Sequence, residues 1–305
     1  MIEVEDLGKR YGDKVAVESL SFTVRPGVVT GFLGPNGAGK STTMRMIMGL
    51  DRPTSGRVTV NGRPHAKHRA PLHEIGALLE AKAMHPGRSA YHHLLALAVS
   101  NGIGTKRVSE VIDLVGLGEV ARKRVGSFSL GMGQRLGIAS ALLGNPRTVM
   151  LDEPVNGLDP EGVLWIRTLL KTLAGEGRTV FVSSHLMSEM ALTATDLIVI
   201  GRGRLISAGP IADFTARASG RGVVVRTPDA ARLRGLLLQD GVTVRSSEAG
   251  VLEVEGLEAA EIGERAAANT VVLHELSVKE ASLEEAFMEM TRDSVEYQAV
   301  LGGAR

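Results

Sequence analysis

Short apolar runs alternate with stretches of helical periodicity along the first two thirds of the chain, a pattern typical of an α/β fold. Two of these runs, at residues 28–33 and 148–151, are almost wholly apolar and are bounded by turn residues. Further strands are predicted at residues 2–7, 21–25, 57–60, 179–183, 197–200 and 204–207. Because strands buried on both faces of a sheet have this apolar composition, we expect a mainly parallel sheet at the core.

The pattern changes between about residues 90 and 144. Apolar side chains such as Leu94, Leu97, Val108 and Val111 recur there at intervals of three and four residues. This spacing predicts amphipathic helices, and we interpret the segment as a helical subdomain inserted into the α/β core.

The last third of the chain has its own succession of elements. A stretch of Ser, Gly and Arg at 218–222 predicts a linker between a domain at 1–217 and a smaller one at 223–305. In the smaller domain, strands are expected at 223–226, 242–245, 251–254 and 271–275, and helices at 230–239, 259–268 and 282–291. The order β-α-β-β-α-β predicts a small α+β domain of ferredoxin-like type.

Composition narrows the classes of protein to consider. The 305 residues include no cysteine, which excludes disulfides and thiolate metal sites, and a formal net charge of +1 gives no indication of nucleic-acid binding. The first residues are acidic, unlike a signal peptide, and no stretch approaches the roughly 20 apolar residues of a membrane helix. We therefore expect a cytoplasmic protein that does not itself span a membrane.

The strongest chemical signal is the segment 34–41, with the sequence GPNGAGKS. It follows a predicted buried strand and precedes a helix, which is the context that a phosphate-binding loop requires. Glycines let backbone N–H groups converge on phosphate oxygens, and the helix N-terminus adds positive partial charge. Lys40 is expected to reach the β- and γ-phosphates, and the Ser41 hydroxyl to bind Mg²⁺.

Two other predicted strands end in polar residues. Residues 148–151 lead into Asp152 and Glu153, and residues 179–183 lead to His185. A carboxylate at the carboxyl end of a central strand lies beside a phosphate loop, so Asp152 is expected to hold Mg²⁺ and Glu153 to polarise a water. Taken alone, each is more often a solvated strand end or an incidental histidine. The phosphate loop is what favours the catalytic interpretation.

The segment 128–135, with the sequence FSLGMGQR, precedes a predicted helix. A serine and a glycine at this place form an N-cap and a group of backbone donors suited to an anion. On physical grounds alone a capped helix is the simpler explanation for Ser129 and Gly131.

Together, and in this order, the four segments resemble the nucleotide-binding subunit of ABC transporters over roughly residues 1–215. The resemblance implies a P-loop NTPase fold of ABC type, with a mainly parallel sheet, an antiparallel β-subdomain and a helical subdomain. It implies two subunits that meet head to tail around ATP and Mg²⁺, with Ser129 and Gly131 of one subunit binding the γ-phosphate held by the other. It also implies that Tyr11 stacks on adenine, although a partly buried surface tyrosine is the alternative. Segment 156–160, with Asp159, resembles the loop that touches the partner's site.

The resulting candidate residues fall into three groups. For catalysis they are Lys40, Glu153 and His185. For nucleotide binding they are Tyr11, Gly34, Pro35, Asn36, Gly37, Ala38, Gly39, Lys40, Ser41, Thr42, Ser129, Gly131 and Asp159. For the metal they are Ser41, Glu80 and Asp152.

Two positions depart from the commonest family pattern. Leu130 and Met132 stand in the signature where glycine and glutamine are usual, which leaves the backbone donors but removes a polar contact. Glu80 stands where most relatives have glutamine; a carboxylate still ligates Mg²⁺ but adds negative charge beside the phosphates. Drug-exporter and lantibiotic-immunity relatives are similar at Glu80, and segment 282–287 resembles the tail of ABC-2-type export ATPases.

We therefore predict an ATPase that dimerises on ATP and drives a separate membrane permease, for export of a drug, antibiotic or lipid. It is expected at the inner face of the membrane, with the permease docked near residues 80–92. Two other classes remain open: an ABC ATPase acting on DNA or ribosomes, and a nucleotide sensor whose C-terminal module binds a regulatory ligand. The lack of a second ATPase half argues against the first, and the intact catalytic residues argue against the second.

Overall fold

The computed structural model describes residues 1–80, 84–217, 222–279 and 282–291. Within them the chain divides into two compact units: the first is Met1–Ile211 with Thr291, and the second is Ala212–Met290.

The division differs from the predicted boundary at residue 217. Strand β9 (Arg204–Pro210) ends just before helix α8 (Ile211–Arg217), most of which belongs to the second unit. The Ser/Gly/Arg stretch predicts a linker, which stays a prediction, and its composition does not show where the packing changes from one unit to the other. Of the predicted linker, residues 218–221 lie outside the described residues, and residue 222 begins strand β10. Of the predicted smaller domain, residues 292–305 also lie outside the described residues.

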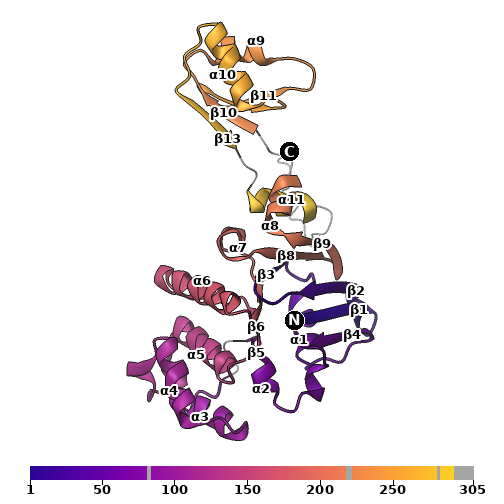
Figure 1. Cartoon of the computed structure of the whole chain (residues 1–305), viewed down its shortest axis with the longest axis vertical. Coiled ribbons are helices and arrows are strands. Elements are labelled where there is room, and N and C mark those ends of the chain that lie inside the picture. Colours follow the sequence, from indigo (N-terminus) through magenta and orange to yellow (C-terminus); the bar gives the residue numbers. More distant parts are fainter. Residues whose placement is uncertain (81–83, 218–221, 280–281, 292–305) are drawn as a thin grey trace, which may run out of the picture. The chain divides into compact units, whose positions relative to one another are not determined.

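The first unit is built on a six-stranded sheet (Figure 1). Its strands, in spatial order, are β5 (Ile75–Leu78), β6 (Thr148–Asp152), β7 (Thr179–Ser183), β3 (Val29–Leu33), β8 (Asp196–Gly201) and β9. All neighbours are parallel except β8 and β9, which run antiparallel. Since β3, β7 and β8 are buried at every position, the apolar runs give the predicted mainly parallel core.

A second, antiparallel sheet of the first unit has the order β2 (Lys14–Val24), β1 (Ile2–Tyr11) and β4 (Ser55–Val60). Strand β2 begins seven residues before the predicted start at residue 21. Its pairing with β1 is interrupted by register shifts. These irregularities, with Ser19 at a φ of 49°, hide the alternation in the sequence.

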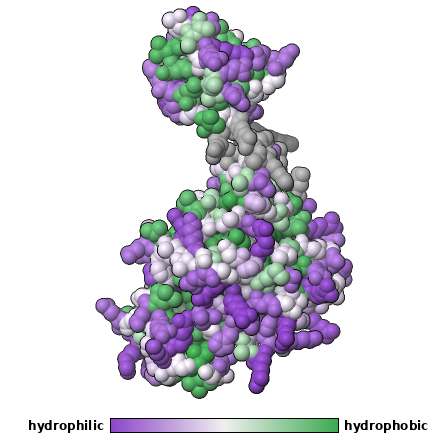
Figure 2. Space-filling model, in the orientation of Figure 1, coloured by the Kyte–Doolittle hydropathy of each residue, from purple (hydrophilic) through white to green (hydrophobic). Residues whose placement is uncertain are grey.

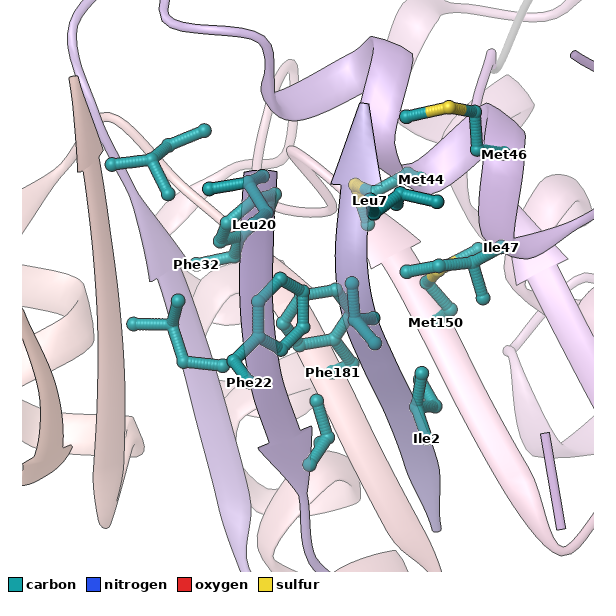
Figure 3. Close-up of a cluster of buried hydrophobic side chains, with 14 of the residues drawn as sticks. Ile2, Leu7, Leu20, Phe22, Phe32, Met44, Met46, Ile47, Met150 and Phe181 are labelled. Atoms are coloured by element: carbon teal, nitrogen blue, oxygen red, sulfur yellow. The ribbon is translucent and has the colours of Figure 1, made fainter. Parts of the chain in front are cut away.

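A hydrophobic cluster of the first unit holds residues from both sheets and from helix α1 (Lys40–Ile47) (Figure 3). Phe22 of β2 contacts Phe32 of β3 and Phe181 of β7, with ring centroids 5.8 and 6.0 Å apart. The rings of Phe32 and Phe181 are 5.0 Å apart, and Phe32 and Phe181 are fully buried. This packing holds the strands whose ends carry the candidate chemistry.

The helical subdomain consists of α3 (Ala90–Ser100), α4 (Thr105–Leu114) and α5 (Leu130–Leu142), as the periodicity predicts. Helix α5 starts at Leu130, inside the segment 128–135 that was expected to precede it, because the Ser129 side chain accepts a hydrogen bond from the Met132 N–H and caps the helix. The remaining helices of the first unit are α2 (Pro71–Glu74), α6 (Pro160–Gly175) and α7 (Met187–Thr193).

The second unit contains a four-stranded sheet in the order β11 (Thr243–Glu248), β12 (Val251–Glu255), β10 (Gly222–Arg226) and β13 (Glu275–Lys279). With helices α9 (Ala230–Leu237) and α10 (Ala259–Ala268), its elements follow one another as β-α-β-β-α-β. Helix α11 (Leu283–Thr291) follows. The predicted strand at 271–275 is wrong by four residues, because Val271 enters the core from a loop and pairing with β10 starts at Glu275.

No helix among the described residues is long and apolar enough to cross a bilayer. Figure 2 shows hydrophilic side chains over much of the visible face of the larger body, with hydrophobic ones in scattered patches.

Candidate functional site

The phosphate loop lies between β3 and α1, where the sequence predicts it. Gly39 has a φ of 100°, and a side chain there would bring its Cβ within 2.6 Å of the Ala16 carbonyl oxygen. Gly37 has a φ of 81°. Glycine alone adopts such angles without strain, so the loop bends tightly, as a loop whose backbone N–H groups converge on an anion must do.

Lys40 opens α1 and is nearly buried beneath this loop. Its Nζ donates to the carbonyl oxygens of Gly34 at 2.6 Å and Pro35 at 3.3 Å. Burial lowers the pKa of the Lys40 ammonium, while the carboxylates of Glu153 and Asp152 oppose that shift. The ammonium is thus a cation with few waters around it, placed to bind phosphate strongly.

Ser41 and Asp152 lie next to each other, although 111 residues separate them in the chain. The Ser41 hydroxyl donates to the Asp152 carboxylate at 3.0 Å. On its other oxygen, Asp152 accepts a hydrogen bond from the Ser183 hydroxyl at the end of β7. β7 lies between β3 and β6, so this buried hydroxyl fixes the carboxylate in front of the phosphate loop.

Glu153 and His185 form a pair at the same edge of the sheet. The Nδ1 atom of His185 lies 2.7 Å from the Glu153 carboxylate, which also accepts the His185 backbone N–H at 3.3 Å. The Glu153 side chain is 23% exposed and that of His185 is 53% exposed. A carboxylate held by an imidazole and open to water has the geometry of a general base.

Tyr11, at the end of β1, belongs to a separate group of polar contacts. Its hydroxyl donates to Asp51 at 3.0 Å, and Asp51 also accepts two hydrogen bonds from the Arg45 guanidinium at 2.8 and 3.2 Å. The Lys9 ammonium lies 4.8 Å from the centre of the Tyr11 ring. Desolvation and then Asp51 raise the pKa of the Tyr11 hydroxyl, so it stays a neutral hydrogen-bond donor.

Tyr11, the phosphate loop, Asp152 and Glu153 contribute to the lining of a cavity of about 490 Å³, whereas His185 is not part of that lining. It is lined by Tyr11, Lys14, Ala16, Asn36, Gly37, Ala38, Gly39, Lys40, Ser41, Thr42, Asp152 and Glu153. The volume suits a nucleotide, and the lining combines an aromatic ring, a phosphate loop and carboxylates. The Ser41 hydroxyl and Asp152 carboxylate are the hard oxygen donors that Mg²⁺ prefers, so the donor set fits that ion.

Some predicted site residues lie elsewhere in the described part of the chain. Ser129 and Asp159 are the N-caps of α5 and α6, and Gly131 lies in the first turn of α5. None of the three lines the cavity of its own chain. Their predicted contacts with nucleotide stay predictions, because the resemblance assigns Ser129 and Gly131 to the partner's site.

Glu80 lines a different cavity of about 360 Å³, together with residues such as Arg45, Leu79 and His93. The first cavity does not include Glu80 in its lining, so the structure does not bring it together with Ser41 and Asp152. Its predicted metal contact stays a prediction. The Nδ1 atom of His93 is buried without a hydrogen-bond partner, and burial followed by Arg88 lowers the pKa of His93.

Sequence reasoning missed three residues that organise the site. Ser183 bonds both acids, Gln134 of α5 donates to the Glu153 carbonyl at 3.1 Å, and Asp51 bonds Tyr11. Ser183 alone had a signal, since it ends a predicted buried strand two residues before His185. Nothing in the local pattern distinguishes Gln134 or Asp51 from other polar residues.

Known proteins match the chain in both units. Residues 17–156 match the family described as ABC transporter, and residues 221–284 match one described as a domain of unknown function. A bacitracin transport ATP-binding protein, BcrA of Bacillus licheniformis, is 43% identical over 213 residues, covering 69% of this chain and 70% of the relative.

One relative is similar over nearly the full length. The linearmycin resistance ATP-binding protein LnrL of Bacillus subtilis (strain 168) is 33% identical over 306 aligned residues, covering 95% of this chain and 98% of the relative. Among solved structures, the dimeric structure of a bacterial ABC transporter cassette is 25% identical, with a TM-score of 0.64 over 69% of this chain and 98% of that one.

Proposed function

Because the chain belongs to the ATP-binding subunits of ABC transporters, we propose that the cavity around Lys40 is its ATPase site and that this site powers a membrane permease. The substrates of the reaction are ATP and water, and Mg²⁺ accompanies the nucleotide. The observation that carries the proposal is the meeting of Lys40, the Ser41–Asp152 pair and the Glu153–His185 pair at one sheet edge.

The geometry supports the following binding roles. Lys40 and the N–H groups of the phosphate loop hold the β- and γ-phosphates, and Tyr11 contacts the base at the other part of the cavity. Ser41 and Asp152 hold Mg²⁺, which neutralises the charge that develops on the phosphates. The Ser183 hydroxyl keeps the Asp152 carboxylate oriented toward Ser41.

The hydrolytic roles belong to the Glu153–His185 pair. The Glu153 carboxylate takes up a proton from the attacking water, and the buried Lys40 ammonium stabilises the negative charge on the phosphate oxygens. His185 holds the Glu153 carboxylate in place at 2.7 Å and, being half exposed, is free to turn toward the γ-phosphate.

The site is completed by a second subunit. Ser129, with Gly131 behind it, stands exposed at the start of α5, where the capped helix end presents backbone donors. In a head-to-tail dimer these residues bind the γ-phosphate of the partner's ATP, and the loop with Asp159 lies at the same interface. The dimeric solved structure of a related cassette supports this arrangement.

The permease partner docks at the second cavity, between Glu80 and His92. The lining of this cavity combines apolar side chains, such as Met48, Leu50 and Leu79, with polar ones. Residues 81–83 of the segment lie outside the described residues. Docking holds the chain at the inner face of the membrane. Since relatives are named for bacitracin transport and linearmycin resistance, we propose export of an antibiotic or a related amphiphile as the transport function.

The test compares wild type with Glu153→Gln in Mg-ATP, with oligomeric state and phosphate release measured on the same samples. We expect wild type to hydrolyse ATP, and the variant to accumulate as an ATP-bound dimer with phosphate release reduced about 100-fold or more. A variant that still hydrolyses ATP at the wild-type rate would remove Glu153 from the mechanism. Crosslinks from residues 84–92 that never capture a membrane protein would contradict the docking site.

A further inference from the structure

The backbone of Glu153 has an unfavourable conformation. Its φ is +50°, in the left-handed region that side chains other than glycine seldom occupy. Such a conformation persists only when surrounding contacts hold it, and it tends to occur where a side chain must be aimed. The Glu153 carboxylate is aimed at His185.

Two side chains hold the backbone of Glu153, one on each side of its Cα atom. The Glu153 N–H donates to the Ser183 hydroxyl at 2.9 Å, and its carbonyl oxygen accepts the Gln134 amide at 3.1 Å. Gln134 is 3% exposed, so its amide has little access to water as an alternative partner. Ser183 ends a neighbouring strand of the sheet, whereas Gln134 comes from α5 of the helical subdomain.

The first turns of α5 pack closely on the segment that follows Glu153. A Cβ on Gly131 would lie 2.7 Å from the Gly157 carbonyl oxygen, and a Cβ on Gly157 would lie 2.4 Å from the Leu130 side chain. Residues 153–157 therefore rest on the start of α5, and the Gln134 hydrogen bond joins the two at the strained peptide.

We propose that Gln134 is a positioning residue for the general base, a role that rests on the function proposed for Glu153. Its amide holds the Glu153 carbonyl so that the peptide keeps its left-handed conformation and the carboxylate stays beside His185. Without this donor the peptide relaxes toward a common backbone conformation and the carboxylate leaves its aligned place. Ser129 caps the helix that carries Gln134, so a shift of α5 would move Gln134 and change the direction of the Glu153 side chain in the same subunit.

The test replaces Gln134 by Met, which keeps the volume but removes the donor, in the full-length chain. Under conditions in which wild type hydrolyses ATP, kcat should fall about 10- to 100-fold because the carboxylate is misplaced. The Kd for Mg-ATP should change less than about twofold, since Gln134 does not line the nucleotide cavity. Gln134→Glu, which is nearly isosteric but donates no hydrogen bond when ionised, should lose at least as much.

The matched control is Arg107→Met. Arg107 of α4 donates to the carbonyl oxygens of Leu142 and Leu143 at 2.9 and 3.3 Å, and it also pairs with Glu110. The substitution therefore removes hydrogen bonds between a side chain and backbone carbonyls at the far end of α5, away from Glu153. Its kcat should stay within about twofold of wild type. A comparable fall in kcat would mean that general loosening of α5, rather than the contact with Glu153, slows the reaction.

A double variant separates positioning from a structural role. In a Glu153→Gln background no base remains, so Gln134→Met should reduce the residual hydrolysis no further. A further loss there, a weaker Kd for Mg-ATP, or a wild-type kcat in Gln134→Met would each overturn the inference. If Glu153→Gln itself keeps full activity, the proposed function fails first, and the two failures are distinguishable.

Discussion

The two units of this chain differ in where their strands end. In the first unit β6, β7 and β3 are parallel neighbours, so their carboxyl ends meet at one edge and bring Asp152, Ser183 and the phosphate loop together. In the described sheet of the second unit the three neighbouring pairs are antiparallel, so successive strand ends alternate between opposite edges. Both sheets bury an apolar core, but only parallel pairing gathers polar strand ends into a site.

The comparison implies that the core of the second unit and the chemistry of the first can be damaged separately. The largest effect should come from Leu252→Ala in β12, where Leu252 is 1% exposed. The cavity left behind should lower the free energy of unfolding of the second unit by about 3 kcal/mol. Denaturant unfolding followed with and without ATP measures this, and Leu238→Ala, at a 55% exposed position, is the control. A large loss of ATP affinity in Leu252→Ala would show that the units are not independent.

Lys40→Met makes the converse change. Removing the buried ammonium should weaken ATP binding about 100-fold, which corresponds to about 2.7 kcal/mol, because several charge-assisted hydrogen bonds to phosphate are lost. Titration with a fluorescent ATP analogue measures the affinity, and Lys106→Met on the exposed side of α4 should bind as wild type does. ATP binding that survives in Lys40→Met would place the nucleotide elsewhere.

Asp51→Asn should have a smaller effect on ATP affinity, confined to the contact between Tyr11 and the adenine base. Asp51 joins Tyr11 to Arg45, and the amide weakens the pair of bonds to Arg45. We expect ATP affinity to fall about threefold while competition by inorganic tripolyphosphate is unchanged, since that ligand has no base. An equal loss for both ligands would mean that the phosphate loop, rather than Tyr11, had moved.

The smallest effect concerns pH and should appear only in the unfolding of the first unit. Burial and then Arg88 hold the pKa of His93 below 6.5, so the unfolded chain takes up a proton more readily. Stability therefore falls as the pH falls through 6.5 toward the lower folded value. His93→Leu should flatten this dependence when urea midpoints at about pH 7.5 and about pH 5.5 are compared. Some slope should persist, because burial also lowers the pKa of His65.

Much of the fold could be predicted because apolar patterning is strong where strands are fully buried. β3, β6 and β7 follow their predicted ranges within a residue. β5 was not predicted, since it has four residues and contains Gly76, which resembles a turn signal. A Cβ at Gly76 would lie 1.7 Å from the Ala141 carbonyl oxygen, so the glycine is there because α5 packs closely on the strand. Packing of this kind leaves no local pattern.

The site was predictable where one residue type determines the chemistry. Lys40, Asp152 and Glu153 line one cavity, and His185 bonds Glu153, whereas the catalytic roles that the motifs assign to them stay predictions. What the sequence does not reveal is how they are held, because a hydrogen bond such as that from Gln134 to the Glu153 carbonyl joins elements by tertiary geometry. Glu80 shows the opposite case, since it follows a recognisable segment and yet lines another cavity.

Side chains alternate between the two faces along a strand, so the function of β6 and β7 depends on the number of residues between their core and site positions. Met150 and Phe181 point into the hydrophobic cluster, and two residues later Asp152 and Ser183 point the same way into the site. Replacing a side chain at one of these places alters only the contacts of that side chain. Inserting or deleting one residue between Met150 and Asp152, or between Phe181 and Ser183, would turn every later side chain of that strand to the opposite face. Among related proteins, substitutions in these strands should therefore be tolerated more often than insertions or deletions.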